Sequence, residues 1–159
     1  MGTDPDLTLH VIQRGNNRGS CFFREADYTA YLGYLRFYAA RFGCAVHAYC
    51  LMTNHVHLLM TPHQADACAL VMKQLWEGRF RSCLVGSEQY ALACYRYIEL
   101  NPVRARIVAR PREYRWSSYG ANAEGRRDEM ITPHPAYCGL AEGPARRHLA
   151  DMLLLSRAK

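Results

Sequence analysis

The chain has 159 residues, a formal charge of +6 and hydrophobic residues at half of its positions. This length suits one domain with a sizeable core, because domains mostly hold about 100–150 residues. No apolar run approaches the roughly 20 residues of a membrane-spanning helix, and residues 1–9 lack the basic and apolar leader of a secreted protein. We therefore expect a cytoplasmic protein.

Cysteine usage agrees with that compartment. The seven cysteines are odd in number and form no Cys-x-x-Cys pair, so we expect reduced thiols that act as small hydrophobic residues. They are Cys21, Cys44, Cys50, Cys68, Cys83, Cys94 and Cys138.

The positive charge is carried by arginines that crowd the second half of the chain, whereas lysine occurs only as Lys73 and Lys159. Arginine contacts phosphate in a bidentate manner and stacks on bases, so this bias favours a phosphate-rich partner. A solvated surface encoded by a GC-rich genome explains the bias equally well.

The first elements are a strand and a helix. Residues 7–13 are rich in β-formers, and residues 14–19 form a turn rich in Gly and Asn. Residues 27–42 place apolar side chains at spacings of three and four, which predicts a helix with Asp27 as its cap and Gly43 at its end.

The next elements complete a repeating pattern. Residues 46–52 and 55–61 are β-rich runs with a two-residue link, which predicts an antiparallel hairpin. A short apolar helix over residues 66–75 and a strand over residues 79–85 follow. The order β-α-β-β-α-β predicts an α+β, ferredoxin-like fold, an antiparallel sheet with helices on one face.

The rest of the chain is less regular. Ser87 caps a second clear helix that ends at the Asn101-Pro102 pair, and residues 146–155 favour a last short helix. We divide the chain into a domain over residues 1–122 and a C-terminal extension over residues 123–159.

The sharpest chemical feature is the sequence His55-Val56-His57. Side chains at positions i and i+2 of a strand point to the same face, so both imidazoles can reach one metal ion while Val56 enters the core. An isolated His-x-His is more often a surface or locally hydrogen-bonded pair, which by itself favours the structural interpretation.

The surrounding motifs change that balance. The segments around the histidine pair are HVIQRGNNR (10–18), GCAVHAY (43–49), LMTNHVHLL (51–59), WEGRFRS (76–82), ACYRYIELNPVRA (93–105) and WSSY (116–119). Through these segments the chain resembles the REP-associated tyrosine transposases, a branch of the single-tyrosine HUH transposases, over most of residues 9–122.

The resemblance implies a protein that binds single-stranded DNA, often near hairpins. It also implies that His55 and His57 hold a divalent cation, Mg²⁺ or Mn²⁺, and that a tyrosine hydroxyl attacks DNA to leave a 5′-phosphotyrosine and a free 3′-hydroxyl. The choice of metal comes from the resemblance, because imidazole ligands alone favour zinc or another transition metal.

The chain departs from the family where the attacking tyrosine is expected. Relatives have a longer helix after the histidine strand, whereas residues 67–75 here contain no tyrosine and run straight into Trp76. Three explanations of the missing tyrosine are open: an internal deletion, a substitute tyrosine such as Tyr95 or Tyr97, or a segment omitted from the sequence. We favour the deletion, interpret both tyrosines as packing residues and assign no catalytic tyrosine.

Four arginines are the candidate DNA contacts: Arg14, Arg18, Arg79 and Arg81. His10 and His47 could support a metal ligand, although packing within the sheet is the favoured interpretation. Glu77 could lie near DNA or orient a metal-bound water.

Tyr49, Phe80 and Trp76 could stack on bases, and core packing is favoured for each.

The sequence leaves three functions open. The first is a transposase-like protein that binds single-stranded or hairpin DNA and is impaired in nicking. The second is a non-catalytic DNA-binding module, and the third is a phosphoesterase that uses activated water. A homodimer is possible, and the sequence does not decide between one copy and two.

Overall fold

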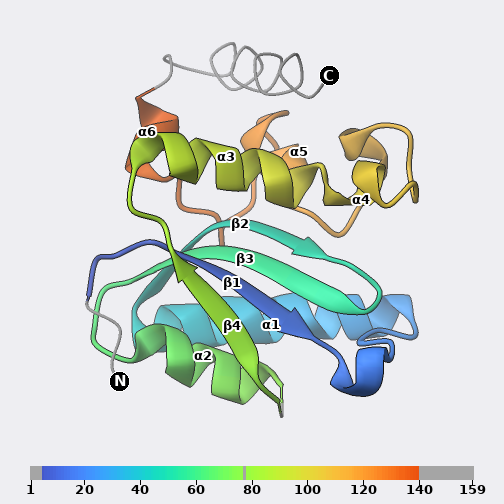
Figure 1. Ribbon diagram of the computed structural model, residues 1–159, viewed down its shortest axis with the longest axis horizontal. Coiled ribbons are helices and arrows are strands. Elements are labelled where there is room, and N and C mark those ends of the chain that lie inside the picture. Colours follow the sequence, from blue (N-terminus) through green and yellow to red (C-terminus); the bar gives the residue numbers. More distant parts are fainter. Residues whose placement is uncertain (1–4, 77, 140–159) are drawn as a thin grey trace.

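The computed structural model describes residues 5–76 and 78–139 (Figure 1). In chain order the first elements are β1 (Leu9–Arg14), η1 (Asn16–Arg18), α1 (Glu25–Phe42), β2 (Cys44–Leu51), β3 (His55–Pro62), α2 (Ala67–Leu75) and β4 (Phe80–Leu84). The later elements are all helical: α3 (Glu88–Glu99), α4 (Asn101–Arg104), η2 (Pro111–Glu113), α5 (Tyr119–Asn122) and α6 (Pro135–Cys138).

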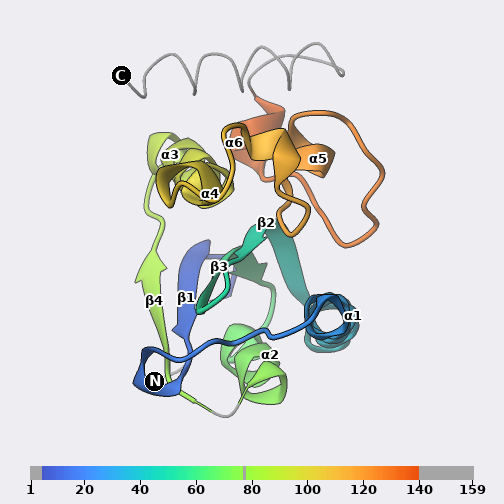
Figure 2. The same cartoon turned by 90° about the vertical axis from the view of Figure 1, so that its right-hand side faces the viewer.

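The four strands form one antiparallel sheet in the order β2-β3-β1-β4. This is the order of a ferredoxin-like βαββαβ unit, so the predicted fold class is confirmed. Helices α1 and α2 belong to this unit and cover one face of the sheet, as predicted. Helix α3 follows the unit and covers the other face, so the sheet lies between two helical layers (Figure 2).

Side chains of β3 point alternately to the two faces of the sheet, so this strand contributes to a separate hydrophobic core on each face. Val56, Leu58 and Met60 pack in the cluster under α1 and α2, whereas Leu59 packs in the cluster under α3. His57 has the same parity as Leu59 and therefore points toward α3. The histidine strand is thus fixed from both sides by buried apolar contacts.

Local signals explain where α1 begins and ends. The helix begins at Glu25, two residues before the predicted start, because the Asp27 carboxylate accepts the backbone N–H groups of Phe23 and Arg24. It ends as predicted at Gly43, whose φ of 75° is readily adopted by glycine. The other predicted elements differ from the observed ones by one or two residues at their ends.

The turn after β1 requires a glycine. A Cβ atom at Gly15 would lie 2.3 Å from the carbonyl oxygen of Gly19, which no larger residue can accommodate without backbone movement. The Gly15 N–H also donates to the carbonyl of Asn54 at 3.1 Å, which ties this turn to the β2–β3 link beside the histidines.

Segments after α4 attach to the outer edge of β2. Leu51 N–H donates to Trp116 O, Ser118 N–H donates to Tyr49 O, and Thr132 N–H donates to Val46 O. Residues beyond 122 therefore continue to pack on the sheet as far as α6. The boundary after residue 122 stays a prediction, and the predicted helix over residues 146–155 lies outside the described residues.

The thiols match the sequence interpretation, because none of the seven cysteines is in a disulfide and five of them are buried. None of the helices in the described ranges has the length and apolar character needed to span a membrane.

A buried histidine on β2 makes fold stability sensitive to acid. His47 Nε2 lies 2.7 Å from Thr61 Oγ1, and its Nδ1 lies 2.6 Å from the carbonyl oxygen of Thr132. With Nδ1–H donating to that carbonyl, Nε2 has to accept from the threonine hydroxyl, which only the neutral ring can do. Burial lowers the pKa of His47 to about 4.

We expect the stability of His47→Gln to decrease less in acid than that of the unmodified protein. A lowered folded-state pKa gives stability that is present above the unfolded pKa and is lost as the pH falls toward the folded one. Between pH 7.5 and pH 5, the free energy of unfolding should fall by roughly 2 kcal/mol less in the variant than in the unmodified protein, measured by urea titration. The exposed His63, changed to Gln, is the control. An unaltered pH slope in His47→Gln would contradict the assignment.

Candidate functional site

The predicted metal ligands lie side by side at the start of β3. The ring centroids of His55 and His57 are 4.9 Å apart, with an interplanar angle of 84°. His57 is 3% exposed, and His55 is half-buried. Val56 points into the opposite core, as the strand alternation predicts. Both imidazoles are therefore on one face, next to α3.

His10 of β1 contacts this pair directly. Its Nε2 lies 3.1 Å from His57 Nδ1, and the two ring centroids are 5.3 Å apart. His47 contacts neither ligand, because Thr61 and Thr132 hold its ring. The sequence analysis gave His10 and His47 the same interpretation, whereas in the structure only His10 contacts the histidine pair.

The electrostatics keep the pair uncharged. Burial, together with the neighbouring His55, His10, Arg104 and Arg14, lowers the pKa of His57 to about 3. Burial and then Arg14 also lower the pKa of His55. Both rings are therefore neutral near pH 7, the state in which an imidazole nitrogen can bind a metal ion.

Two close, neutral imidazoles fit a divalent cation with open coordination positions. When His57 donates its Nδ1–H to His10, its Nε2 lone pair is left for a metal ion. Within residues 5–76 and 78–139, no group of three or more His, Cys, Asp or Glu side chains is arranged to hold a metal. Structural metal sites are usually closed by four protein ligands, whereas this pair supplies two.

Tyr97 of α3 lies against the histidines. Its ring centroid is 5.4 Å from that of His57 and 5.9 Å from that of His10, and the residue is 46% exposed. Tyr95 is 1% exposed instead, and its hydroxyl accepts the backbone N–H of His134. Two residues correspond to about 200° around a helix, so the two tyrosines face different surroundings. Packing is confirmed for Tyr95, whereas Tyr97 combines contact with the histidines and exposure to solvent.

Arg104 is a residue that the sequence analysis did not single out. Its guanidinium carbon lies 4.1 Å from the ring centroid of Tyr97, and its Nη2 donates to the Tyr97 carbonyl. The sequence feature that could have indicated this contact is the Asn101-Pro102 pair. Helix α4 begins there and brings Arg104 back over α3. A permanent positive charge therefore lies beside Tyr97 and the histidine pair.

The four predicted DNA-contacting arginines are all exposed. Arg14 is the register partner of His55, and Arg81 is the partner of Ile12, which is itself opposite His57. Opposed residues on neighbouring strands share a face, so Arg14 and Arg81 belong to the histidine face.

Arg18 is the last residue of η1, and Arg79 lies in the segment just before β4. These two segments approach each other, since a Cβ atom at Gly78 would be 3.8 Å from Asn16 Oδ1. Glu77 lies outside the described residues.

The aromatic candidates pack against the core, as favoured. Tyr49 is buried and its hydroxyl donates to Asp128, while Trp76 and Phe80 pack on the cluster under α1 and α2.

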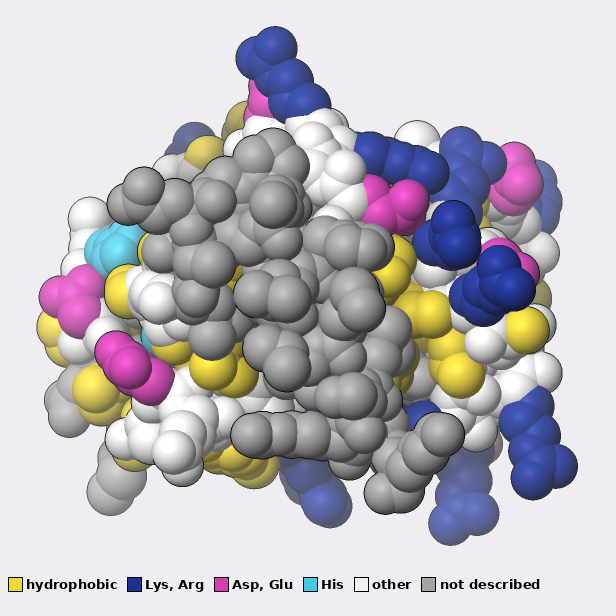
Figure 3. All heavy atoms as spheres, turned by 90° about the horizontal axis from the view of Figure 1, so that it is seen from above, with side chains coloured by type: hydrophobic (Ala, Val, Ile, Leu, Met, Phe, Trp, Pro, Cys, Tyr) yellow, Lys and Arg dark blue, Asp and Glu magenta, His cyan; other side chains and the backbone are white. Residues whose placement is uncertain are grey.

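Basic side chains also gather along one side of the α3 layer when it is seen from above (Figure 3). A pocket lined by Tyr49, Glu124 and Asp128 also contains four arginines: Arg112, Arg115, Arg126 and Arg127.

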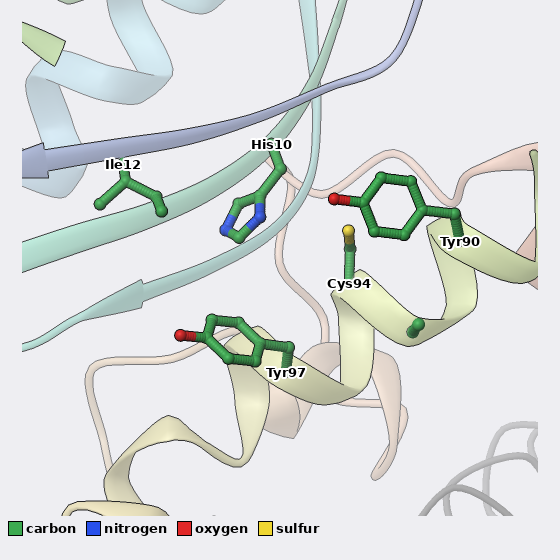
Figure 4. A pocket seen from close by; sticks show the side chains of 6 residues that line it. His10, Ile12, Tyr90, Cys94 and Tyr97 are labelled. Atoms are coloured by element: carbon green, nitrogen blue, oxygen red, sulfur yellow. The ribbon is translucent and has the colours of Figure 1, made fainter. Parts of the chain in front are cut away.

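A cavity of about 300 Å³ opens between α3 and β1, directly beside the histidines (Figure 4). Its lining residues are His10, Ile12, Tyr90, Ala93, Cys94 and Tyr97.

Comparisons with known proteins agree with this geometry. Residues 3–75 match the family model of the IS200-like transposases, so the resemblance predicted from the sequence is confirmed. A solved structure of a REP-associated tyrosine transposase bound to a REP hairpin matches with a TM-score of 0.64 and 16% identity, over 86% of this chain and 93% of that one. The curated proteins contain no match to the sequence. Tyr97 and Arg104 lie beyond the stretch that the family model matches.

The two tyrosines should differ in their contribution to stability. We expect Tyr95→Ala to lower the free energy of unfolding by about 3 to 5 kcal/mol, because it empties a buried aromatic site. Tyr97→Ala should cost about 1 kcal/mol or less, because its half-exposed ring loses only edge contacts with His57 and His10 and the contact with Arg104. Urea denaturation of both variants measures the difference. Equal losses would contradict the packing assigned to the two rings.

Proposed function

We propose that the protein nicks and rejoins single-stranded DNA near hairpins through Tyr97, on the premise of the match between residues 3–75 and the family model of the IS200-like transposases. The observation that carries the proposal is the contact of the Tyr97 ring with His57, which lies beside His55 on β3, and with His10 of β1. A tyrosine hydroxyl beside a metal-binding pair is what phosphotyrosine chemistry requires.

Charge on the histidine face supports DNA as the partner. Arg14 and Arg81 share that face, and Arg104 overhangs Tyr97. Their guanidinium groups suit a phosphodiester backbone that approaches the histidines. The solved structure with the same fold holds a DNA hairpin, which supports the same class of partner here. We place this activity in the cytoplasm, where unpaired thiols stay reduced.

His55 and His57 would hold the divalent cation, Mg²⁺ or Mn²⁺ by resemblance to the family. When bound, such an ion supplies Lewis acid polarisation of a phosphodiester. The protein contributes two neutral rings whose orientation is fixed by β3 and by His10. Because imidazoles suit Mn²⁺ less well than transition metals later in the series, the cation should also rely on water and phosphate oxygens.

The proposed step balances within the DNA and Tyr97. The tyrosine oxygen attacks phosphorus and forms the Tyr–O–P bond while the bond from phosphorus to the 3′ oxygen breaks. The phenolic proton passes to solvent, and the departing 3′ oxygen takes up a proton. The product is a 5′-phosphotyrosine with a free 3′-hydroxyl, and attack by a 3′-hydroxyl reverses the step.

Tyr97 changes the expectation about activity. The sequence predicted an impaired protein because the segment after residue 75 that should carry the tyrosine is absent. We propose an active protein instead, because α3 brings a half-exposed tyrosine to the histidines without that segment.

We expect a covalent adduct with single-stranded hairpin DNA in the presence of Mn²⁺, resolved by denaturing gel electrophoresis. Tyr97→Phe should abolish the adduct, because it removes the attacking oxygen while keeping the ring. Tyr95→Phe is the matched control, and it should retain the adduct. An adduct that persists in Tyr97→Phe would refute the assignment of this tyrosine.

The metal role is tested in the same assay. The double variant His55→Ala and His57→Ala should lose both the adduct and any Mn²⁺-dependent gain in DNA affinity. If no adduct forms with the unmodified protein and DNA binding is unchanged by this double variant, the non-catalytic DNA-binding module is the correct function.

One chain supplies both the histidines and the tyrosine in this proposal, which is supported by the contact between His57 and Tyr97. We therefore expect a mixture of His57→Ala and Tyr97→Phe proteins to stay inactive. Activity restored by mixing would show instead that a homodimer shares its tyrosines between copies.

A further inference from the structure

The proposed chemistry uses Tyr97 and His10 at the cavity between α3 and β1, but it gives no role to the other residues that line it: Ile12, Tyr90, Ala93 and Cys94. Figure 4 shows His10 and Ile12 entering it from the strand, and Tyr90, Cys94 and Tyr97 entering it from the helix. We propose that this cavity holds one unstacked nucleobase of the DNA strand, next to the phosphodiester that Tyr97 attacks. The proposal rests on the proposed function and adds a determinant of sequence specificity to it.

The position of the cavity fixes which nucleotide it can hold. His10 and Tyr97 line the cavity and also flank His57, with ring centroids 5.3 Å and 5.4 Å from that histidine. A base in the cavity is therefore connected through a single sugar to a phosphate at the histidines. The occupant should be the nucleotide immediately on one side of the nick.

The size and lining suit a base. About 300 Å³ is at the lower end of the range for small-molecule sites, enough for one heterocycle and too small for a base pair. Flipped bases are held between aromatic or apolar side chains and are identified by a few polar groups. Tyr90 and Tyr97 supply half-exposed rings, Ala93 leaves open space, and His10 and the tyrosine hydroxyls supply polar atoms.

Backbone charge would be neutralised at both sides of the cavity. Arg81 is the register partner of Ile12 on the β4 side, and Arg104 lies over Tyr97 on the α4 side. A strand whose phosphates pass from one guanidinium to the other presents the intervening base to the cavity. Aromatic platforms combined with a basic track are the usual arrangement for single-stranded nucleic acid.

The first test uses the unmodified protein and needs no variant. Hairpin oligonucleotides carry an abasic site at each position around the nick in turn, and adduct formation and binding affinity are measured for each. We expect a loss on the order of tenfold at one position adjacent to the nick and smaller effects elsewhere. Equal responses at every position would overturn the proposal.

The second test fills the cavity. Ala93→Trp places a large ring in it, and Ala40→Trp makes the same change on an exposed site of α1, on the far side of the sheet. Ala93→Trp should weaken binding of intact DNA about tenfold and should abolish the distinction between intact and abasic DNA. Ala40→Trp should behave like the unmodified protein.

The two proposals fail differently. If an adduct forms but neither abasic DNA nor Ala93→Trp has a position-specific effect, the base site is wrong and the proposed function stands. If no adduct forms with any DNA, the proposed function fails. In that case a 2-aminopurine base next to the hairpin still tests the cavity, since fluorescence quenching by Tyr90 should be lost in Tyr90→Ala, and unchanged quenching would overturn the base site.

Discussion

The site depends on the alternation of side chains along β3, a central strand that is hydrogen-bonded on both sides. Val56, Leu58 and Met60 are buried under α1 and α2, so His57 and Leu59 must face α3. A shift of register by one residue would bury the imidazole in the apolar layer and expose three apolar side chains to α3. The direction of the histidines is therefore enforced by the same packing that stabilises the sheet.

Burial of the imidazoles gives the site its charge state. Removing His57 from water disfavours its protonated form, and the neighbouring arginines act in the same direction. The arginines near the histidine pair therefore also keep the two rings unprotonated. Under the proposed function, this face can attract phosphate and still present neutral histidines to a metal ion.

The sequence predicted what short-range periodicity determines. The order of the strands and helices, the hairpin before His55 and the shared face of the two histidines follow from alternation and turn chemistry, and they agree with the structure. Helix ends were less accurate, since Asp27 acts as an acceptor from the third position of α1 rather than as its first residue.

Contacts between elements far apart in the sequence could not be predicted from periodicity. The packing of α3 on the histidine face, which separates Tyr97 from Tyr95, depends on how a helix outside the βαββαβ unit crosses the sheet. The contact of Arg104 with Tyr97 depends in addition on the turn at Pro102. The metal, the DNA contacts and the base site stay predictions, because each concerns a partner that sequence periodicity does not describe.

The covering of β2 has a consequence for self-association. Backbone groups of Tyr49 and Leu51 are bonded to the segment around Trp116 and Ser118, so that side of the sheet has few open positions for another strand. In the part of the chain that the structure describes, β4 is the other end of the sheet, and it is short, exposed and carries Arg81. Short charged edges resist recruitment into amyloid-like ladders. We therefore expect the cover on β2 and the short, charged β4 to disfavour edge-to-edge polymerisation.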